Sequence, residues 1–272
     1  MELQTRPLAA RFGAEVLGLD LAGIDAPMAD AIQDALVRHG LLLLRRQSLH
    51  DQEILRVAEA FGEVVELAAK KYHAPGFTQV NYVSNLHDDT QRLIGGLTAA
   101  DQDEGVWHSD QNFRARPATI STLLCVHNPA HGGGTSFTST VLGYAALPEP
   151  VKARIQGLRG RYLPGKVHEI EKIEVDHPVV LVNPVTGVRA LYVAGNTLGF
   201  TGLQAEEGEA LKTELLDCLL RAEHQYRHDW RMGDMLIYDN AQLVHRREAF
   251  RGLRWLKSTR SFADPARFAV PD

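Results

Sequence analysis

The feature that most limits the fold is a series of short, strand-like runs in the second two thirds of the chain, separated by clusters of turn residues. Apolar and β-branched residues fill the runs 118–127, 136–140 and 235–238, and a pair of strands, 177–180 and 191–193, flanks a turn at 183–187. Short strands punctuated in this way are typical of sandwiches and barrels. The length allows two domains or one β-rich domain with insertions. Because no repeat or linker divides the 272 residues, we predict a single domain over 1–272.

Helical patterns are confined to a few segments. Pro27 and Gly40 bracket a helix expected at 28–39, and the apolar strand 41–45 follows it. Ser48 is the expected N-cap of a second helix at 51–61, and Thr201 that of an amphipathic helix at 204–221. Another short helix is expected at 148–158. We therefore predict a mainly β fold with helical additions, a double-stranded β-helix (jelly-roll, cupin-like barrel) flanked by helices.

Composition excludes several classes of function. The net charge is -5, and acidic and basic residues are interspersed without a polybasic run, so neither nucleic acid nor a membrane surface is an expected partner. Cys125 and Cys218 lie in apolar surroundings and form no C-x-x-C pair, which suits a reducing compartment. The N-terminal residues lack the apolar segment of a signal peptide, and the longest purely apolar run is too short to cross a bilayer. We expect a cytoplasmic protein.

The stretch Val106-Trp107-His108-Ser109-Asp110 carries the strongest chemical signal. If it is a strand, His108 and Asp110 point to the same face. His245, at the end of a later apolar run, is the best third partner. Two histidines and one carboxylate are the ligand set of non-haem Fe(II) oxygenases. The same donors suit zinc. A zinc-dependent hydrolase or lyase on a cupin-like barrel, or a non-catalytic ligand-binding barrel, are the alternatives.

These motifs together resemble the TauD/TfdA-like (taurine dioxygenase-like) family of Fe(II)/2-oxoglutarate-dependent dioxygenases. The H-x-D triplet, the Gly-Gly-Gly-Thr turn ending in Thr135, and the segment GDMLIYDNAQLVH ending in His245 follow one another in the family's order. The resemblance implies Fe(II) at the triad, with 2-oxoglutarate and dioxygen as cosubstrates. It implies hydroxylation or desaturation of a small molecule, with release of succinate and CO2, and no catalytic residue beyond the metal site. Homo-oligomers are common in the family.

The same resemblance assigns 2-oxoglutarate binding to Thr135 and to an arginine, whose planar fork suits a carboxylate. A gap-free alignment favours Arg254. Arg260 lies six residues further on and would point the same way on a regular strand, so both stay candidates. For Thr135, the alternative is a simple hairpin turn.

Substrate contacts are harder to predict. The positions that hold the sulfonate in taurine-type members are Ala68, Glu104 and Ser258 here, so we expect taurine to be a poor substrate. Glu104 would repel a sulfonate and favours an amine-bearing or neutral compound. The irregular segment 62–100 is either an active-site lid or a surface insertion. Among the remaining histidines only His224 and His228 have a ligand-like spacing, and because no third ligand is in view, a surface role is expected for them. Further candidates for substrate contact are Lys70, Tyr72, Asn81, Trp107 and Gln111.

Overall fold

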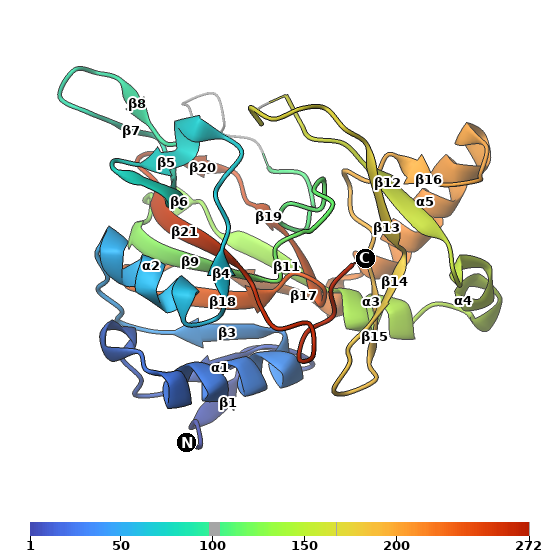
Figure 1. The fold of residues 1–272 in the computed structure, drawn as a ribbon, viewed down its shortest axis with the longest axis horizontal. Coiled ribbons are helices and arrows are strands. Elements are labelled where there is room, and N and C mark those ends of the chain that lie inside the picture. The colour runs from blue at the N-terminus through green and yellow to red at the C-terminus, as the bar shows by residue number, and fades with distance from the viewer. Residues whose placement is uncertain (98–103, 167, 272) are drawn as a thin grey trace.

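The structure, a computed structural model, describes residues 1–97, 104–166 and 168–271. Its largest unit is a nine-stranded sheet in the order β1-β2-β3-β18-β9-β21-β6-β5, with β4 beside β21 (Figure 1). The pairs are antiparallel except for β2 with β3. The strands are β1 (Thr5–Pro7), β2 (Ala14–Val16), β3 (Leu41–Leu44), β4 (Glu63–Val64), β5 (His73–Ala74), β6 (Phe77–Ser84), β9 (Ile120–His127), β18 (Met235–Asp239) and β21 (Trp255–Phe262).

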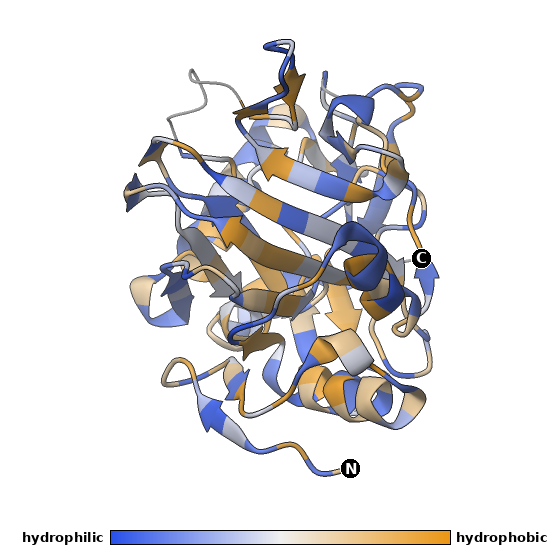
Figure 2. Ribbon diagram, turned by 90° about the vertical axis from the view of Figure 1, so that its left-hand side faces the viewer, coloured by the Kyte–Doolittle hydropathy of each residue, from blue (hydrophilic) through white to orange (hydrophobic). Residues whose placement is uncertain are grey.

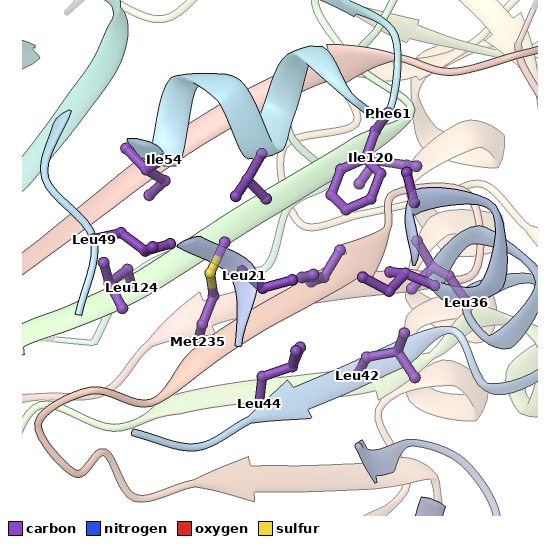
Figure 3. Close-up of a cluster of buried hydrophobic side chains, with 14 of the residues drawn as sticks. Leu21, Leu36, Leu42, Leu44, Leu49, Ile54, Phe61, Ile120, Leu124 and Met235 are labelled. Atoms are coloured by element: carbon purple, nitrogen blue, oxygen red, sulfur yellow. The ribbon is translucent and has the colours of Figure 1, made fainter. Parts of the chain in front are cut away.

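Helices α1 (Ala26–His39) and α2 (Asp51–Glu59) cover one face of this sheet. The core between these helices and the sheet takes alternate residues of the strands, because successive side chains of a strand point to opposite faces. Leu42 and Leu44 of β3 join this core, which Figure 3 shows in close-up, whereas Leu41 and Leu43 face the other side of the sheet. Burial of one leucine side chain contributes about 1.5–3 kcal/mol, so the run of four leucines anchors both cores.

The helix starts follow local hydrogen bonds. Asp25 caps α1 by accepting the N–H of Met28 at 2.9 Å. The expected Ser48 cap of α2 is wrong: His50 occupies the cap position, and the Glu53 carboxylate accepts its N–H at 2.7 Å. The helix begins at Asp51 as expected, so only the cap lies two residues later than the sequence pattern indicated.

A second sheet faces the other side of the main sheet. It has the order β17-β11-β19, from β17 (Gln225–His228), β11 (Thr135–Ser139) and β19 (Leu243–Arg247). Phe137 of β11 packs edge-on against Tyr238 of β18, with ring centroids 5.3 Å apart. Figure 2 shows alternating hydrophilic and hydrophobic bands along the strands, which is the pattern of sheets that bury specific faces. The mainly β prediction is therefore confirmed, although the described strands form open sheets, not one closed barrel.

A helical layer with its own core lies beyond the second sheet. Helix α5 begins after Gln204, not at the expected cap Thr201. None of the helices in the described part of the chain has the length and apolar character of a membrane span. The layer and the remaining small elements are α3 (Thr140–Ala145), α4 (Glu149–Ile155), α5 (Ala205–Leu219), η1 (Leu21–Gly23), η2 (Lys70–Tyr72), η3 (Ala222–His224), β7 (Leu86–His87), β8 (Leu93–Ile94), β10 (His131–Gly132), β12 (Arg159–Tyr162), β13 (Val175–Pro178), β14 (Val180–Val182), β15 (Arg189–Leu191), β16 (Gly199–Phe200) and β20 (Phe250–Arg251).

The expected surface position of His224 and His228 is wrong. Both side chains are buried, and their imidazoles bind different partners: the carbonyl of Leu219 at 3.3 Å for His224 and the carboxylate of Asp234 at 3.1 Å for His228. These contacts tie η3 and β17 to neighbouring segments. Neither histidine belongs to a cluster of potential metal ligands among the described residues.

Candidate metal centre and substrate cavity

His108 and His245 lie opposite each other in an isolated antiparallel bridge. The N–H of His108 donates to the carbonyl of His245 at 3.0 Å, and the N–H of His245 donates to the carbonyl of His108 at 2.9 Å. Gly105 adds a hydrogen bond to the carbonyl of Arg247 at 2.8 Å. The segment before the H-x-D triplet is thereby fastened along β19, and the two imidazole centroids lie 4.3 Å apart.

The strand expected at 106–110 is wrong, because only His108 forms a bridge and the chain turns from Asp110 onward. Asn240, which follows β18, causes this turn: its side-chain oxygen accepts the N–H of Asp110 at 3.2 Å, and its carbonyl accepts the hydroxyl of Ser109 at 2.8 Å. Gln111 then adopts a left-handed backbone with φ of 57°. Even so, one ligand atom each from His108, Asp110 and His245 lies within 4.8 Å of the others. A single metal ion fits such a group.

The carboxylate of Asp110 is held at both oxygens. Arg260 Nη2 donates to Oδ1 at 2.7 Å, and the hydroxyls of Ser121 and Tyr238 donate to Oδ2 at 2.7 and 2.8 Å. Burial alone would raise the pKa of Asp110, but the charge of Arg260 and the neighbouring imidazoles outweigh burial and hold the pKa well below its usual range. Asp110 is therefore ionised, and its carboxylate can give an electron pair to a metal ion.

Both histidines present a nitrogen suited to a metal. Nδ1 of His108 lies 2.8 Å from the carbonyl of Val106, which can only accept, so Nδ1 carries the proton and Nε2 keeps its lone pair. Burial and repulsion from His108 lower the pKa of His245 to about 3. The imidazole of His245 is thus neutral, which is the form that binds metals.

Arg254 and Thr135 have the properties expected of a binding site for a carboxylate. Arg254 is buried just before β21, and its Nε donates to the carbonyl of Gly133 at 3.1 Å, two residues before Thr135. Its Nη1 is buried without a hydrogen-bond partner in the described chain. Burial and repulsion from Arg247 lower the pKa of Arg254 to about 9, so the side chain stays charged at neutral pH. A buried guanidinium with one unpaired nitrogen, held at the turn that ends in Thr135, fits one end of a dicarboxylate such as 2-oxoglutarate.

A cavity of about 520 Å3 opens beside the triad, and His108, Asp110 and Arg260 form part of its wall. Arg254, Thr135 and His245 are not among its described lining residues. Of the residues predicted to contact substrate, three line the cavity: Tyr72, Asn81 and Gln111. Four do not: Lys70, Glu104, Trp107 and Ser258. Glu104 instead pairs with Arg246 at 2.6 Å, and Trp107 packs into the core around α5 beneath the Arg246 guanidinium.

Sequence reasoning missed several residues of this site. Asn112 and Asn196 line the cavity and exchange amide hydrogen bonds of 2.9 Å. Phe113 and His168 also line it, with ring centroids 4.0 Å apart. Asn112 and Phe113 lie two and three residues after Asp110 and could have been found from that position. Asn196 and His168 lie far along the chain in segments without a recognisable motif.

Comparisons with known proteins agree with this geometry. Residues 4–260 match the model of the family described as "Taurine catabolism dioxygenase TauD, TfdA family". The α-ketoglutarate-dependent sulfate ester dioxygenase of Pseudomonas putida is 30% identical over 266 residues, covering 90% of this chain and 84% of that protein. The (S)-phenoxypropionate/α-ketoglutarate dioxygenase of Sphingobium herbicidovorans is 28% identical over 258 residues, covering 88% and 87%.

The α-ketoglutarate in these names is another name for 2-oxoglutarate. Comparison with a solved structure gives the same result. The crystal structure of a taurine dioxygenase from Burkholderia xenovorans superposes with a TM-score of 0.82 at 28% identity, covering 100% of this chain and 95% of that one. The resemblance indicated by the motifs is thus confirmed over nearly the whole chain. The chain belongs to the TauD/TfdA family of Fe(II)- and 2-oxoglutarate-dependent dioxygenases.

Proposed function

We propose that His108, Asp110 and His245 hold the Fe(II) ion and that a small-molecule substrate occupies the adjoining cavity. The observation that carries this proposal is the convergence of three ligand atoms within 4.8 Å of one another, two of them from residues of the cavity wall, His108 and Asp110. Bound iron would supply dioxygen activation: 2-oxoglutarate loses CO2 and becomes succinate with one oxygen atom, and the other oxygen atom hydroxylates the substrate or leaves as water after desaturation. The protein's own task is to orient the carboxylate of Asp110, which Arg260, Ser121 and Tyr238 do.

We assign the distal carboxylate of 2-oxoglutarate to Arg254 and Thr135. Arg254 and Arg260 each have a buried Nη1 without a partner in the described chain. Arg260, however, already forms an ion pair with Asp110, whereas Arg254 approaches the turn that ends in Thr135 and forms no ion pair within the described residues. A buried charge without a partner is costly, so an incoming carboxylate would stabilise Arg254 most. The role of Arg260 is therefore to support the metal site.

The substrate we propose is a small compound with a mainly apolar body. Leu67, Ala69, Leu97 and Phe113 form much of the cavity wall. Since Glu104 is absent from the described wall, its expected repulsion of a sulfonate loses its structural basis. The P. putida relative is named for sulfate esters and the S. herbicidovorans relative for phenoxypropionate. Taurine is not the proposed primary substrate, because the two positions that are cationic or histidine in taurine-type members are Ala68 and Ser258 here and provide no cation.

We propose that the segment 62–97 is part of an active-site lid, and its contribution of Leu67, Tyr72 and Leu97 to the cavity wall supports this role. Residues 98–100 of the predicted lid lie outside the described residues. We also propose a single catalytic domain without nucleic-acid or membrane partners. A cytoplasmic location is supported by the buried, unpaired thiols of Cys125 and Cys218.

The test is succinate release with Fe(II), ascorbate and 2-oxoglutarate across a panel of sulfate esters, phenoxyalkanoic acids and taurine. We expect at least one apolar compound to stimulate succinate formation and to yield oxidised product in equal amount, and Asp110→Ala to abolish both. Absence of succinate formation with Fe(II), together with hydrolysis of a panel member by the zinc-loaded protein, would instead support the hydrolase alternative.

A further inference from the structure

We propose that Trp230 is a positioning residue for 2-oxoglutarate, because its indole N–H fixes the direction in which the hydroxyl of Thr135 can donate. This inference rests on the assignment of Thr135 to 2-oxoglutarate above. Nε1 of Trp230 lies 3.0 Å from Oγ1 of Thr135, and both side chains are buried. The two residues are distant in sequence and meet only in the folded chain.

The chemistry of the two groups determines the direction of this hydrogen bond. An indole N–H can only donate, whereas a threonine hydroxyl has one proton and two acceptor lone pairs. Trp230 therefore occupies an acceptor position of Thr135 and leaves the hydroxyl proton unused by this contact. In the described part of the chain, the hydroxyl of Thr135 forms no other hydrogen bond. The free proton is available to a carboxylate oxygen.

The indole is held in place independently of Thr135. The ring of His228 meets the indole edge-on, with centroids 4.6 Å apart and an interplanar angle of 87°. His228 is itself held from both sides, because Asp234 lies 3.1 Å from its Nε2 and the hydroxyl of Tyr226 lies 3.0 Å from its Nδ1. A rigid indole donor can therefore orient the more freely rotating hydroxyl.

The orientation matters because Arg254 reaches the same turn. Its Nε binds the carbonyl of Gly133, and its unpaired Nη1 remains for a ligand. A carboxylate bound there would accept one hydrogen bond from the guanidinium and one from the Thr135 hydroxyl. If the hydroxyl is oriented beforehand, binding costs less ordering. Trp230 should thus tighten 2-oxoglutarate binding without contacting it.

The experiment is calorimetric titration of 2-oxoglutarate into the Mn(II)-loaded protein without oxygen, so that no turnover occurs. Trp230→Phe removes the N–H and keeps an aromatic ring. We expect its Kd for 2-oxoglutarate to rise about threefold to tenfold, the range of one neutral hydrogen bond. Mn(II) affinity should not change. The matched control is Trp255→Phe, which removes a buried indole N–H without a partner in the described chain, and its Kd should not change.

A double-mutant cycle separates orientation from packing. Thr135→Val should weaken 2-oxoglutarate binding, Thr135→Ser should restore it, and Trp230→Phe should add less than about twofold in the Thr135→Val background. If Trp230→Phe does not fold, replacing tryptophan by benzothienylalanine keeps the bicyclic shape without the N–H and gives the same test. An unchanged Kd in the variant without the N–H, or fully additive effects, would overturn this inference alone. Failure of the wild-type protein to bind 2-oxoglutarate would overturn the proposed function as well.

Discussion

Nη2 of Arg260 lies 2.7 Å from Oδ1 of Asp110, so a partly buried arginine of the cavity wall holds the carboxylate of the candidate metal site. The second oxygen of Asp110 accepts the hydroxyls of Ser121 and Tyr238. With three donors around it, the carboxylate is ionised and cannot rotate freely. The neighbours of a metal ligand can influence affinity strongly in such an arrangement.

Replacing Arg260 should therefore weaken metal binding. We expect Arg260→Ala to lower Fe(II) affinity about tenfold to hundredfold, the usual effect of losing a residue that orients a ligand. Arg260→Lys should recover part of the loss, because it keeps the charge without the planar fork. Anaerobic Fe(II) titration measures the effect. Unchanged Fe(II) affinity with a raised KM for 2-oxoglutarate would instead move the 2-oxoglutarate role to Arg260.

Replacing Arg254 should affect the cosubstrate. We expect Arg254→Ala to raise the KM for 2-oxoglutarate roughly tenfold to hundredfold, since a hydrogen bond to a charged group contributes about 1.5–3 kcal/mol. Thr135→Ala should have a smaller effect. Initial rates of succinate formation at varied 2-oxoglutarate give both values, and Arg251→Ala, an exposed arginine on β20, is the control. A normal KM in Arg254→Ala would contradict the assignment.

Glu104 should act as a structural partner of Arg246 and not as a substrate contact. Their ion pair is partly exposed, with 49% of the Glu104 side chain accessible, so the pair should contribute at most about 1 kcal/mol to the free energy of unfolding. Urea unfolding of Glu104→Gln, Arg246→Gln and the double variant measures this coupling. A change in the preference between amine-bearing and neutral substrates in Glu104→Gln would restore the substrate role predicted from sequence.

His168 should make stability depend on pH. Burial and the charge of Lys172 lower its pKa in the folded protein from 6.5 to about 4. Between these values the unfolded chain binds the proton more readily, so stability is fully present above about pH 6.5 and is lost as pH falls toward 4. Unfolding free energies at several pH values should show that His168→Gln gains stability relative to the wild type as pH falls. A pH-independent difference would contradict this linkage.

The sequence motifs predicted the candidate metal ligands, which the structure brings together, because two of them lie two residues apart and the third ends a specific segment. The backbone around them was not predictable from period-2 alternation, since the turn at Asp110 depends on Asn240, far along the chain. The Ser48 cap was wrong for a local reason, the exchange between His50 and Glu53.

Contacts between distant segments were the least predictable part of the site. Glu104 looked like a substrate contact until its partner Arg246 was known, and nothing in the sequence links Trp230 to Thr135. Arg254 and Arg260 lie six residues apart, just before and within one strand, so the sequence alone could not separate their roles. Their different neighbours in the fold do. Motifs therefore predict which chemistry is present, whereas the fold determines which side chains support it.

The most direct test of the central claim is anaerobic titration of the Fe(II)-loaded protein with 2-oxoglutarate, followed by visible absorption. Chelation of the iron by the 2-oxo acid should produce a saturable charge-transfer band. His108→Ala, Asp110→Ala and His245→Ala should lose the band and tight Fe(II) binding while their circular dichroism stays that of a folded protein. His127→Ala, a histidine at the end of β9 outside the triad, should keep the band. Absence of the band in the wild type, or near-normal Fe(II) binding and turnover in any of the three ligand variants, would contradict the claim.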